Sequence, residues 1–523
     1  MLKLLDSLRL TRIGADGDHP LASPREAAPI YAELRANDPL NAQEEISDWL
    51  VSFAAAENLK PERRFEVIRE LDDLAQPHRV KLAREMATAG RQSKAREAKS
   101  WSVNHELWAR LAAGYDDLIG RIDAKEKGGD ALRKETPLIA IRALRACGLQ
   151  LKWLYLRYGP IPVETWGTLA RAYRFAESRG VQHTRLQAYA SMPGETSPEE
   201  EYLRTLLLSA SAPDALTPAE LDVAERVIAH SAAKFRITLQ ANPDSTYWFD
   251  LAEARAPLRL AAPPAQMTPS LRFFATAAGH MDVNSMLERL ETTKELPRGI
   301  DLGVAAEPES LAQVLRHLRL NWAPRPPVRR SERRRLQARV AVVHGLAAII
   351  GLMRPSDLDL DFGADSGSES WVVENMSGGG FGAVLEQAAG DWLRIGALLG
   401  VQPDGASQHV DIGVVRRLTR DEHGARVRAN VGVQLISRQP LVGVFTTNIG
   451  RWAHGVATVE GIVVPEGGEA GAVLVALPHG LYLPGEQLLA MITEKRHLMF
   501  PIVLVERGED YDLIRFRAMA QDD

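Results

Sequence analysis

The spacing of apolar residues changes once along the chain, at a segment rich in proline and arginine. Before this segment, from about residue 40 to 235, apolar side chains recur three and four residues apart, as Ile46, Leu50 and Phe53 do. That spacing predicts helices. After it, short aliphatic runs such as 432–436 and 472–475 lie between glycine-bearing turns, which indicates antiparallel strands. The segment itself, residues 321–333, is therefore expected to be a linker.

The predicted fold is α+β and multidomain, with an α-helical region followed by antiparallel β-barrels. At 523 residues the chain is too long for one ordinary core. We expect a helical domain over residues 1–235, a mixed bridging region over 236–320 and the linker over 321–333. A first barrel is expected over 334–440, and a second, degenerate one over 441–523.

Local signals support the helical prediction. Ser197-Pro198 and Thr217-Pro218 each offer a capping hydroxyl and a proline at the first helical position. Residues 166–173 match the opening of a tetratricopeptide unit, and no second copy follows at that period. A repeat array and ordinary helical hairpins both remain open, and either would offer a surface for protein partners. Residues 271–290 and 309–320 also have helical spacing, and 247–251 resembles a short strand.

Composition excludes several classes of protein. A net charge of −5 argues against general nucleic-acid binding. Cys147 is the only cysteine, which excludes an internal disulfide and a cysteine-built metal site, and its apolar helical surroundings predict burial. The apolar run 340–353 is interrupted by His344 and is shorter than the roughly 20 residues of a membrane span. We expect a cytoplasmic protein without membrane insertion.

The densest polar constellation lies in two segments, 334–339 and 375–380. Seven arginines and one acid occur between Arg325 and Arg339. They could form a solvated basic linker, attract nucleic acid, or bind phosphate; no aromatic residue follows Trp322 there to stack bases. The second segment supplies Asn375, Ser377 and three glycines at a predicted turn after strand 371–373. An ordinary glycine-rich turn is the alternative, since neither a Walker loop nor a nucleophile elbow fits.

Together these segments resemble the PilZ family, whose members bind cyclic di-GMP. Arg335 and Arg339 match its Arg-x-x-x-Arg element, and residues 375–380 match its Asp/Asn-x-Ser-x-x-Gly element. Residues 413–417 and 431–435 resemble its closing strands, so the resemblance covers roughly 333–440. It implies a PilZ-type barrel whose arginines grip phosphates and a guanine edge, while the turn contacts the rest of the ligand. The implied ligand-binding residues are Arg334, Arg335, Arg339, Asn375, Ser377 and Gly380.

The two elements are separated by a long stretch, residues 340–374, which contains alternating aspartates at 357–361. A calcium loop is disfavoured, because Phe362 occupies the required glycine position and Ser368 the twelfth. One hypothesis is that this acidic stretch covers the arginines when ligand is absent. The second barrel has no Arg-x-x-x-Arg element before it, so we expect it to pack against the first barrel or a partner.

The resemblance therefore implies a non-catalytic cyclic di-GMP receptor, and we expect it to couple nucleotide binding to protein partners of the helical region. The alternative is a scaffold whose degenerate barrel no longer binds nucleotide. An enzyme acting on a phosphorylated substrate is the third choice. The histidines show no short ligand-like spacing, so neither a metal site nor a catalytic group is predicted.

Overall fold

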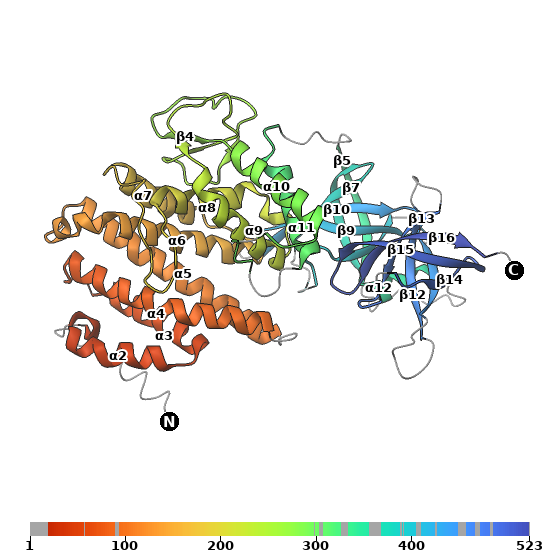
Figure 1. Cartoon of the computed structure of the whole chain (residues 1–523), viewed down its shortest axis with the longest axis horizontal. Helices are drawn as coiled ribbons and strands as arrows, with labels where there is room; N and C mark the ends of the chain where they lie inside the picture. Colours follow the sequence, from red (N-terminus) through yellow and green to blue (C-terminus); the bar gives the residue numbers. More distant parts are fainter. Residues whose placement is uncertain are drawn as a thin grey trace. The chain divides into compact units, whose positions relative to one another are not determined.

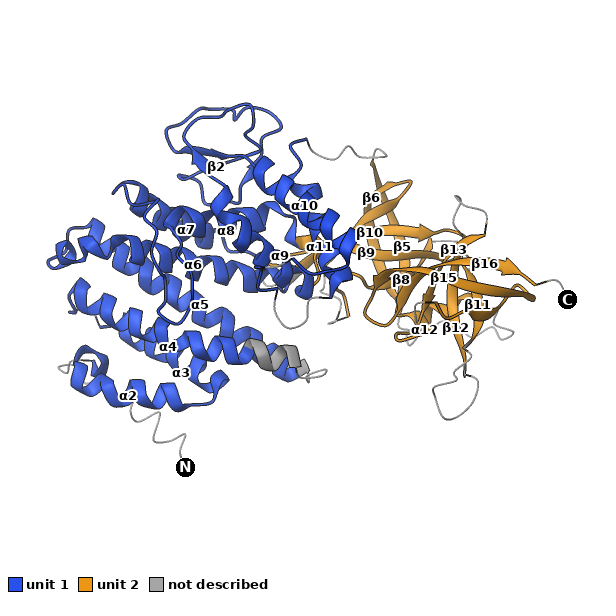
Figure 2. Ribbon diagram, in the orientation of Figure 1, with its two compact units in different colours: residues 1–157, 161–213, 218–327 blue, residues 158–160, 214–217, 328–523 orange. Residues whose placement is uncertain are grey.

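The structure is a computed structural model of the chain. The chain divides into two compact units (Figure 2): residues 1–157, 161–213 and 218–327 form the first, and residues 158–160, 214–217 and 328–523 form the second. The structure describes residues 19–56, 58–88, 94–297, 299–302, 307–325, 333–354, 368–386, 390, 392–403, 409–423, 426–447, 457–465, 471–481 and 485–521.

The first unit is built mainly of helices. In Figure 1 the long helices α4, α5 and α6 lie side by side, and the contacts between them agree. Its helices are α2 (Pro24–Ala36), α3 (Pro39–Ala54), α4 (Pro61–Thr88), α5 (Lys94–Asp123), α6 (Thr136–Tyr155), α7 (Val163–Glu177), α8 (Pro198–Ala210), α9 (Pro218–Ser231), α10 (Ala277–Thr293) and α11 (Pro308–Trp322), with short 3-10 turns at Pro20–Ala22, Gly129–Lys134, Pro213–Ala215 and Ala232–Lys234.

Several helices begin where the sequence predicts. Ser197 caps α8, because its hydroxyl oxygen accepts a hydrogen bond from the Glu200 amide at 3.3 Å. Pro198 occupies the first helical position, and glutamates fill the first turn, where the helix dipole favours negative charge. Helix α9 likewise begins at Pro218. The predicted helix starts at 198 and 218 are thus confirmed.

Between α9 and α10 lies a small sheet with the strand order β1-β4-β2-β3. The predicted strand near 247–251 is confirmed, but the predicted helix over 271–290 is wrong at its start. Leu271–Phe274 is a strand whose four side chains are all buried, and the helix begins at Ala277. Two aromatic rings in a fully buried run favour a strand over a helix turn. The strands are β1 (Ile237–Thr238), β2 (Tyr247–Asp250), β3 (Leu258–Arg259) and β4 (Leu271–Phe274).

The second unit begins with a closed antiparallel barrel in the order β10-β7-β6-β5-β8-β9. Its interior is filled by alternate residues of each strand, such as Val340 and Val342 on β5 and Trp371 and Val373 on β6. The strands are β5 (Arg334–His344), β6 (Glu369–Ser377), β7 (Gly380–Leu385), β8 (Leu398–Pro403), β9 (Asp411–His423) and β10 (Arg426–Ser437).

A second closed barrel follows, in the order β11-β12-β13-β16-β15-β14. Phe445, Val475, Met499, Ile514 and Phe516 fill its centre and are almost fully buried. The helical region followed by antiparallel barrels is confirmed. The strands are β11 (Leu441–Thr447), β12 (Ala457–Pro465), β13 (Ala472–Leu477), β14 (Leu488–Ile492), β15 (Lys495–Arg507) and β16 (Asp512–Ala520).

The two barrels share a third apolar cluster, which contains the short helix α12 (Leu346–Met353). Leu346, Ile349 and Ile350 of this helix are buried among side chains of both barrels, including Ile412 and Ile462. The Leu346 amide donates a 2.6 Å hydrogen bond to Asp510. The second barrel therefore packs against the first through an apolar core.

Two predicted features lie outside the described residues: most of the arginine-rich linker, at 326–332, and the acidic stretch at 357–361. Among the helices that the structure describes, none is both long and apolar enough to cross a membrane.

Candidate anion-binding site

The two segments singled out in the sequence lie on neighbouring strands. In the antiparallel pair β5–β6, Arg335 is opposite Asn375, and Arg334 is opposite Met376. The register shifts between Arg335 and Ala338, after which Arg339 is opposite Val372. Arg334, Arg335 and Arg339 are all exposed. Three arginines and the polar turn are thus carried by one strand pair.

The turn between β6 and β7 consists of Gly378 and Gly379. The Ser377 hydroxyl donates to the Gly380 carbonyl at 3.2 Å, and the Leu435 amide of β10 donates to the Gly379 carbonyl at 3.1 Å. Gly380 has φ +156, and a Cβ atom there would lie 2.1 Å from the carbonyl oxygen of Val433. Only glycine fits at this position, because the clash would be with backbone.

Beside this turn is a hollow of about 170 Å³ on the first barrel. Ser377 and Gly380 are the predicted residues that line it, whereas Arg334, Arg335, Arg339 and Asn375 do not. The Oδ1 atom of Asn375 is buried without a hydrogen-bond partner in the structure. The full lining is Arg333, Ser377, Gly379, Gly380, Arg416, Arg417, Gly432, Val433 and Gln434.

Sequence reasoning missed Arg416 and Arg417 as candidate site residues. Both are on β9, and the register with β10 shifts between Gly432 and Val433, opposite them. A bulge of this kind re-aims side chains, and here two consecutive arginines line one hollow. The sequence of residues 413–417 indicates only a closing strand of the barrel. The arginine pair within that strand was the available signal.

Both arginines are already held by acids. Arg416 makes a two-pronged ion pair with Glu506 of β15, with N–O distances of 2.7 and 2.6 Å, and its Nε donates to Gln434 at 2.9 Å. Arg417 forms an ion pair with Asp214 at an N–O distance of 2.8 Å. Asp214 belongs to the short segment 214–217, which is part of the second unit. None of the described residues that line the hollow is itself acidic.

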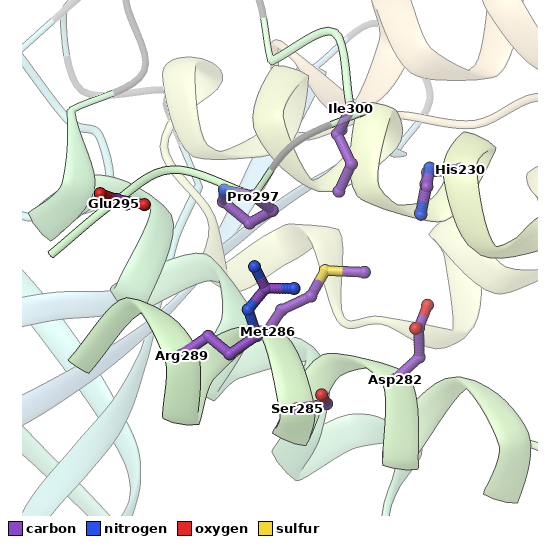
Figure 3. A pocket seen from close by; sticks show the side chains of 8 residues that line it. All are labelled: His230, Asp282, Ser285, Met286, Arg289, Glu295, Pro297 and Ile300. Carbon is purple, nitrogen blue, oxygen red and sulfur yellow. The ribbon is translucent and has the colours of Figure 1, made fainter. Parts of the chain in front are cut away.

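A second hollow, of about 140 Å³, lies in the helical unit between α9, α10 and the chain after α10. Figure 3 shows His230 and Asp282 pointing toward each other at one end, with Glu295 at the other. Asp282 accepts from Ser231 at 2.8 Å and pairs with Lys234 at 2.5 Å. Arg289 is the one arginine among the described residues that line it.

The two hollows differ in the ligand charge they favour. In the part of the chain that the structure describes, three arginines and no carboxylate line the hollow on the barrel. In the helical unit, Asp282 and Glu295 line the hollow together with Arg289 and would repel an anion. Since guanidinium groups bind phosphate oxygens in pairs of parallel hydrogen bonds, the hollow on the first barrel is the better site for a phosphate-bearing ligand.

The helical unit also contains a buried polar network around Asp72. Tyr115 donates to the Asp72 carboxylate at 2.8 Å and Tyr189 at 3.0 Å, and Arg142 lies 3.5 Å away. Burial raises the pKa of the Asp72 carboxyl, and Arg142 opposes that rise. Because Asp72 is buried and satisfied by these partners, the network acts as structural support.

Cys147 is fully buried, as predicted, and burial raises the pKa of its thiol to about 12. A thiol with that pKa is unreactive at neutral pH. Among the residues that the structure describes, no group of three or more histidine, cysteine or acidic side chains could hold a metal ion.

Comparison with known protein families gives a match to the helical part of the chain. None of the curated proteins matches the chain. A family model described as the N-terminal domain of the cyclic-di-GMP receptor FimW matches residues 25–244. The matched part covers α2 to α9 and ends before either barrel, so the PilZ resemblance over 333–440 stays a prediction. The helical part of this chain is similar to the N-terminal domain of the cyclic-di-GMP receptor FimW.

Proposed function

We propose that the protein is a non-catalytic cyclic di-GMP receptor whose nucleotide site lies on the outer surface of the first barrel. The observation that carries the proposal is the hollow lined by Arg333, Arg416 and Arg417 beside the turn at Ser377. The match of residues 25–244 to a domain described as part of a cyclic-di-GMP receptor supports the same ligand independently.

The chemistry of the ligand suits this surface. Cyclic di-GMP carries two phosphate charges, and the O6 and N7 atoms of guanine are the usual target of an arginine fork. Each charge-assisted hydrogen bond contributes roughly 1.5–3 kcal/mol. Three or four such bonds contribute about 5–12 kcal/mol, a range that includes the roughly 8 kcal/mol of micromolar binding.

The hollow would hold one end of the nucleotide. At about 170 Å³ it is smaller than the roughly 300–1,000 Å³ of pockets that enclose a drug-sized ligand. The remainder of the ligand would lie over the β5–β6 pair, where Arg335 is opposite Asn375. The Asn375 Oδ1 atom is buried in the structure, so it would accept a hydrogen bond from a guanine N–H group only after its side chain turns outward.

Binding at this site would act on partners of the helical region. Ligand that contacts Arg333 and the start of β5 would stabilise one arrangement of the chain over others. The helices would then present their surface to a protein partner in that arrangement. This coupling is part of the proposal, and it requires a measurable affinity for the nucleotide.

A scaffold that no longer binds nucleotide is the second candidate. One observation favours it: Arg416 and Arg417 are each neutralised by an acid, Glu506 and Asp214. A ligand would have to displace those carboxylates. The two candidates differ in one measurable quantity, the affinity for cyclic di-GMP.

Calorimetric titration of the full chain with cyclic di-GMP tests the proposal. We expect saturable binding at micromolar concentration and weaker binding of cyclic di-AMP, which lacks the guanine O6 acceptor. Arg335→Ala and Arg417→Ala should each weaken binding by about tenfold or more. Arg394→Ala is the matched control, because Arg394 pairs with Glu509 on the same unit but does not line the hollow.

Three outcomes would count against the proposal. No heat at near-millimolar nucleotide would favour the scaffold. Binding that survives both Arg335→Ala and Arg417→Ala would place the site elsewhere. Conversion of the nucleotide during the titration would indicate an enzyme.

A further inference from the structure

The second barrel has an apolar face on its outer surface that none of the described residues covers. Its exposed members are Val444 (38% exposed), Leu489 (48%), Met491 (44%) and Met519 (54%). They are on β11, β14 and β16, and the half-buried Leu498 of β15 lies between them. These five residues together are called the apolar face.

Strand register makes the apolar face continuous. Val444 is directly opposite Met491, Leu489 is opposite Leu498, and Leu498 is opposite Met519. Side chains that are directly opposite on antiparallel strands have Cβ atoms about 4.5–5.5 Å apart. The apolar face therefore extends across four neighbouring strands. The row formed by Leu489, Leu498 and Met519 contains no polar residue.

Two of the charged groups next to the apolar face are arginines. Arg496 is directly opposite Met491, and Arg517, opposite Phe500, is two residues from Met519. Both arginines are exposed, and no ion pair of either side chain occurs among the described residues. An exposed apolar surface beside unpaired cations favours an occupant that combines apolar side chains with carboxylates.

One segment of this chain has that chemistry. Residues 357–362 read Asp-Leu-Asp-Leu-Asp-Phe. In an extended chain the side chains alternate, so Leu358, Leu360 and Phe362 would share one side and the aspartates the other. The segment lies outside the described residues, which end at Arg354 and resume at Ser368.

The described residues that precede this segment end beside the apolar face. The Arg354 guanidinium donates to the Glu460 carboxylate of β12, and Glu460 is directly opposite Val444. From Glu460 on β12 to Met519 on β16, at the far side of the apolar face, there are four strand spacings, about 19 Å. Leu358 is four residues after Arg354 and Phe362 is eight residues after it. An extended chain therefore allows them to lie up to about 13 Å and 26 Å from Arg354, respectively. The length of chain therefore matches the width of the apolar face.

We propose that the apolar face is the docking surface of the chain's own segment 357–362. Leu358, Leu360 and Phe362 contact the apolar side chains, and the aspartates lie beside Arg496 and Arg517. This assigns the acidic stretch to the second barrel instead of to the arginine segment 334–339. The proposal does not depend on nucleotide binding.

Disulfide trapping in the full chain tests this assignment. Cys147 is fully buried and unreactive, so any disulfide that forms joins the introduced cysteines. Leu360→Cys with Leu489→Cys should form an intramolecular disulfide under mild oxidation. The matched pair, Leu360→Cys with Leu336→Cys, samples an equally exposed residue (44%) in the arginine segment. We expect the first pair to cross-link about tenfold more than the second, because docking raises the local thiol concentration.

Each other result of the trapping experiment would overturn the proposal. Equal yields from the two pairs would show that the segment has no preferred docking surface. A higher yield with Leu336→Cys would place it on the arginine segment. Disulfide-linked dimers would show that a second copy covers the apolar face. Mass spectrometry of the linked peptides distinguishes these results.

A second measurement avoids cysteines. Replacing Leu358, Leu360 and Phe362 together by serine should expose the apolar face and raise the fluorescence of an added hydrophobic dye about twofold or more. Ala364→Ser is the control within the same stretch and should leave the signal unchanged. Equal dye fluorescence for the triple variant and the natural sequence would contradict the docking of this segment.

Discussion

Removing the acid that holds Arg416 should strengthen nucleotide binding. Arg416 lines the proposed site, and Glu506 engages both of its terminal nitrogens at 2.7 and 2.6 Å. A phosphate that binds Arg416 must compete with this carboxylate. The variant Glu506→Gln removes the competing charge and keeps a side chain of similar shape.

The magnitude follows from the exposure of the pair. Two unit charges at about 4 Å interact by roughly 1 kcal/mol in water and 4 kcal/mol near a protein surface. The Arg416 side chain is 37% exposed and that of Glu506 15%, so solvent screening brings the value to about 1 kcal/mol. One kcal/mol corresponds to about a fivefold change in affinity. Arg416→Gln should instead weaken binding by about tenfold or more, through the loss of a charge-assisted bond.

The assay is calorimetric titration with cyclic di-GMP at fixed ionic strength, accompanied by thermal melts to confirm folding. Glu509→Gln is the matched control, because it breaks the Arg394 ion pair at 3.3 Å without touching the hollow. If Glu506→Gln and the natural protein bind equally while Arg416→Gln binds weakly, the competition argument is refuted. Weaker binding by Glu506→Gln would mean that Glu506 orients Arg416 for the ligand.

Two further predictions concern a turn and a buried charge. Gly380→Ala should weaken nucleotide binding and destabilise the barrel by about 1–3 kcal/mol, since its Cβ would lie 2.1 Å from the Val433 carbonyl oxygen, whereas Gly378→Ala has open space and should match the natural protein in titration and thermal melts. Burial alone would raise the pKa of Glu201, but Arg145 and a second arginine outweigh it and lower the pKa to about 2. The charged carboxylate therefore stabilises the fold above its unfolded pKa near 4.3, and about 3 kcal/mol is lost as pH falls from about 5 to 2. Urea unfolding should show a shallower pH dependence for Glu201→Gln, and parallel pH profiles would contradict this reasoning.

Local patterns in the sequence predicted much of the fold. The change of period near residue 330 separates the helices from the barrels, and Ser197 caps α8 as expected. These features depend on neighbouring residues, so the sequence displays them directly. Leu271–Phe274 was misassigned because its burial, and hence its strand pairing, depends on β1 and β2.

The candidate site was predictable only in part. The turn from Ser377 to Gly380 was predictable, because it depends on residues that are consecutive in the sequence. The sequence could not show that Arg416 and Arg417 line the same hollow. Consecutive side chains of a regular strand point to opposite faces, and only the register shift at Gly432 lets both arginines reach one hollow. Nor does the sequence display the partner of Arg416, which is 90 positions further along the chain.

The apolar cluster shared by the barrels has a consequence for how this half of the chain can be divided. Ile412 and Val414 of the first barrel are fully buried in a cluster that also holds Ile462 and Leu513 of the second. Cutting the chain near residue 440 would expose that surface in both fragments. We therefore expect the two barrels to melt in a single cooperative transition. Any shorter version used for binding studies should keep residues 333–521 intact, so that it retains Arg333 of the hollow.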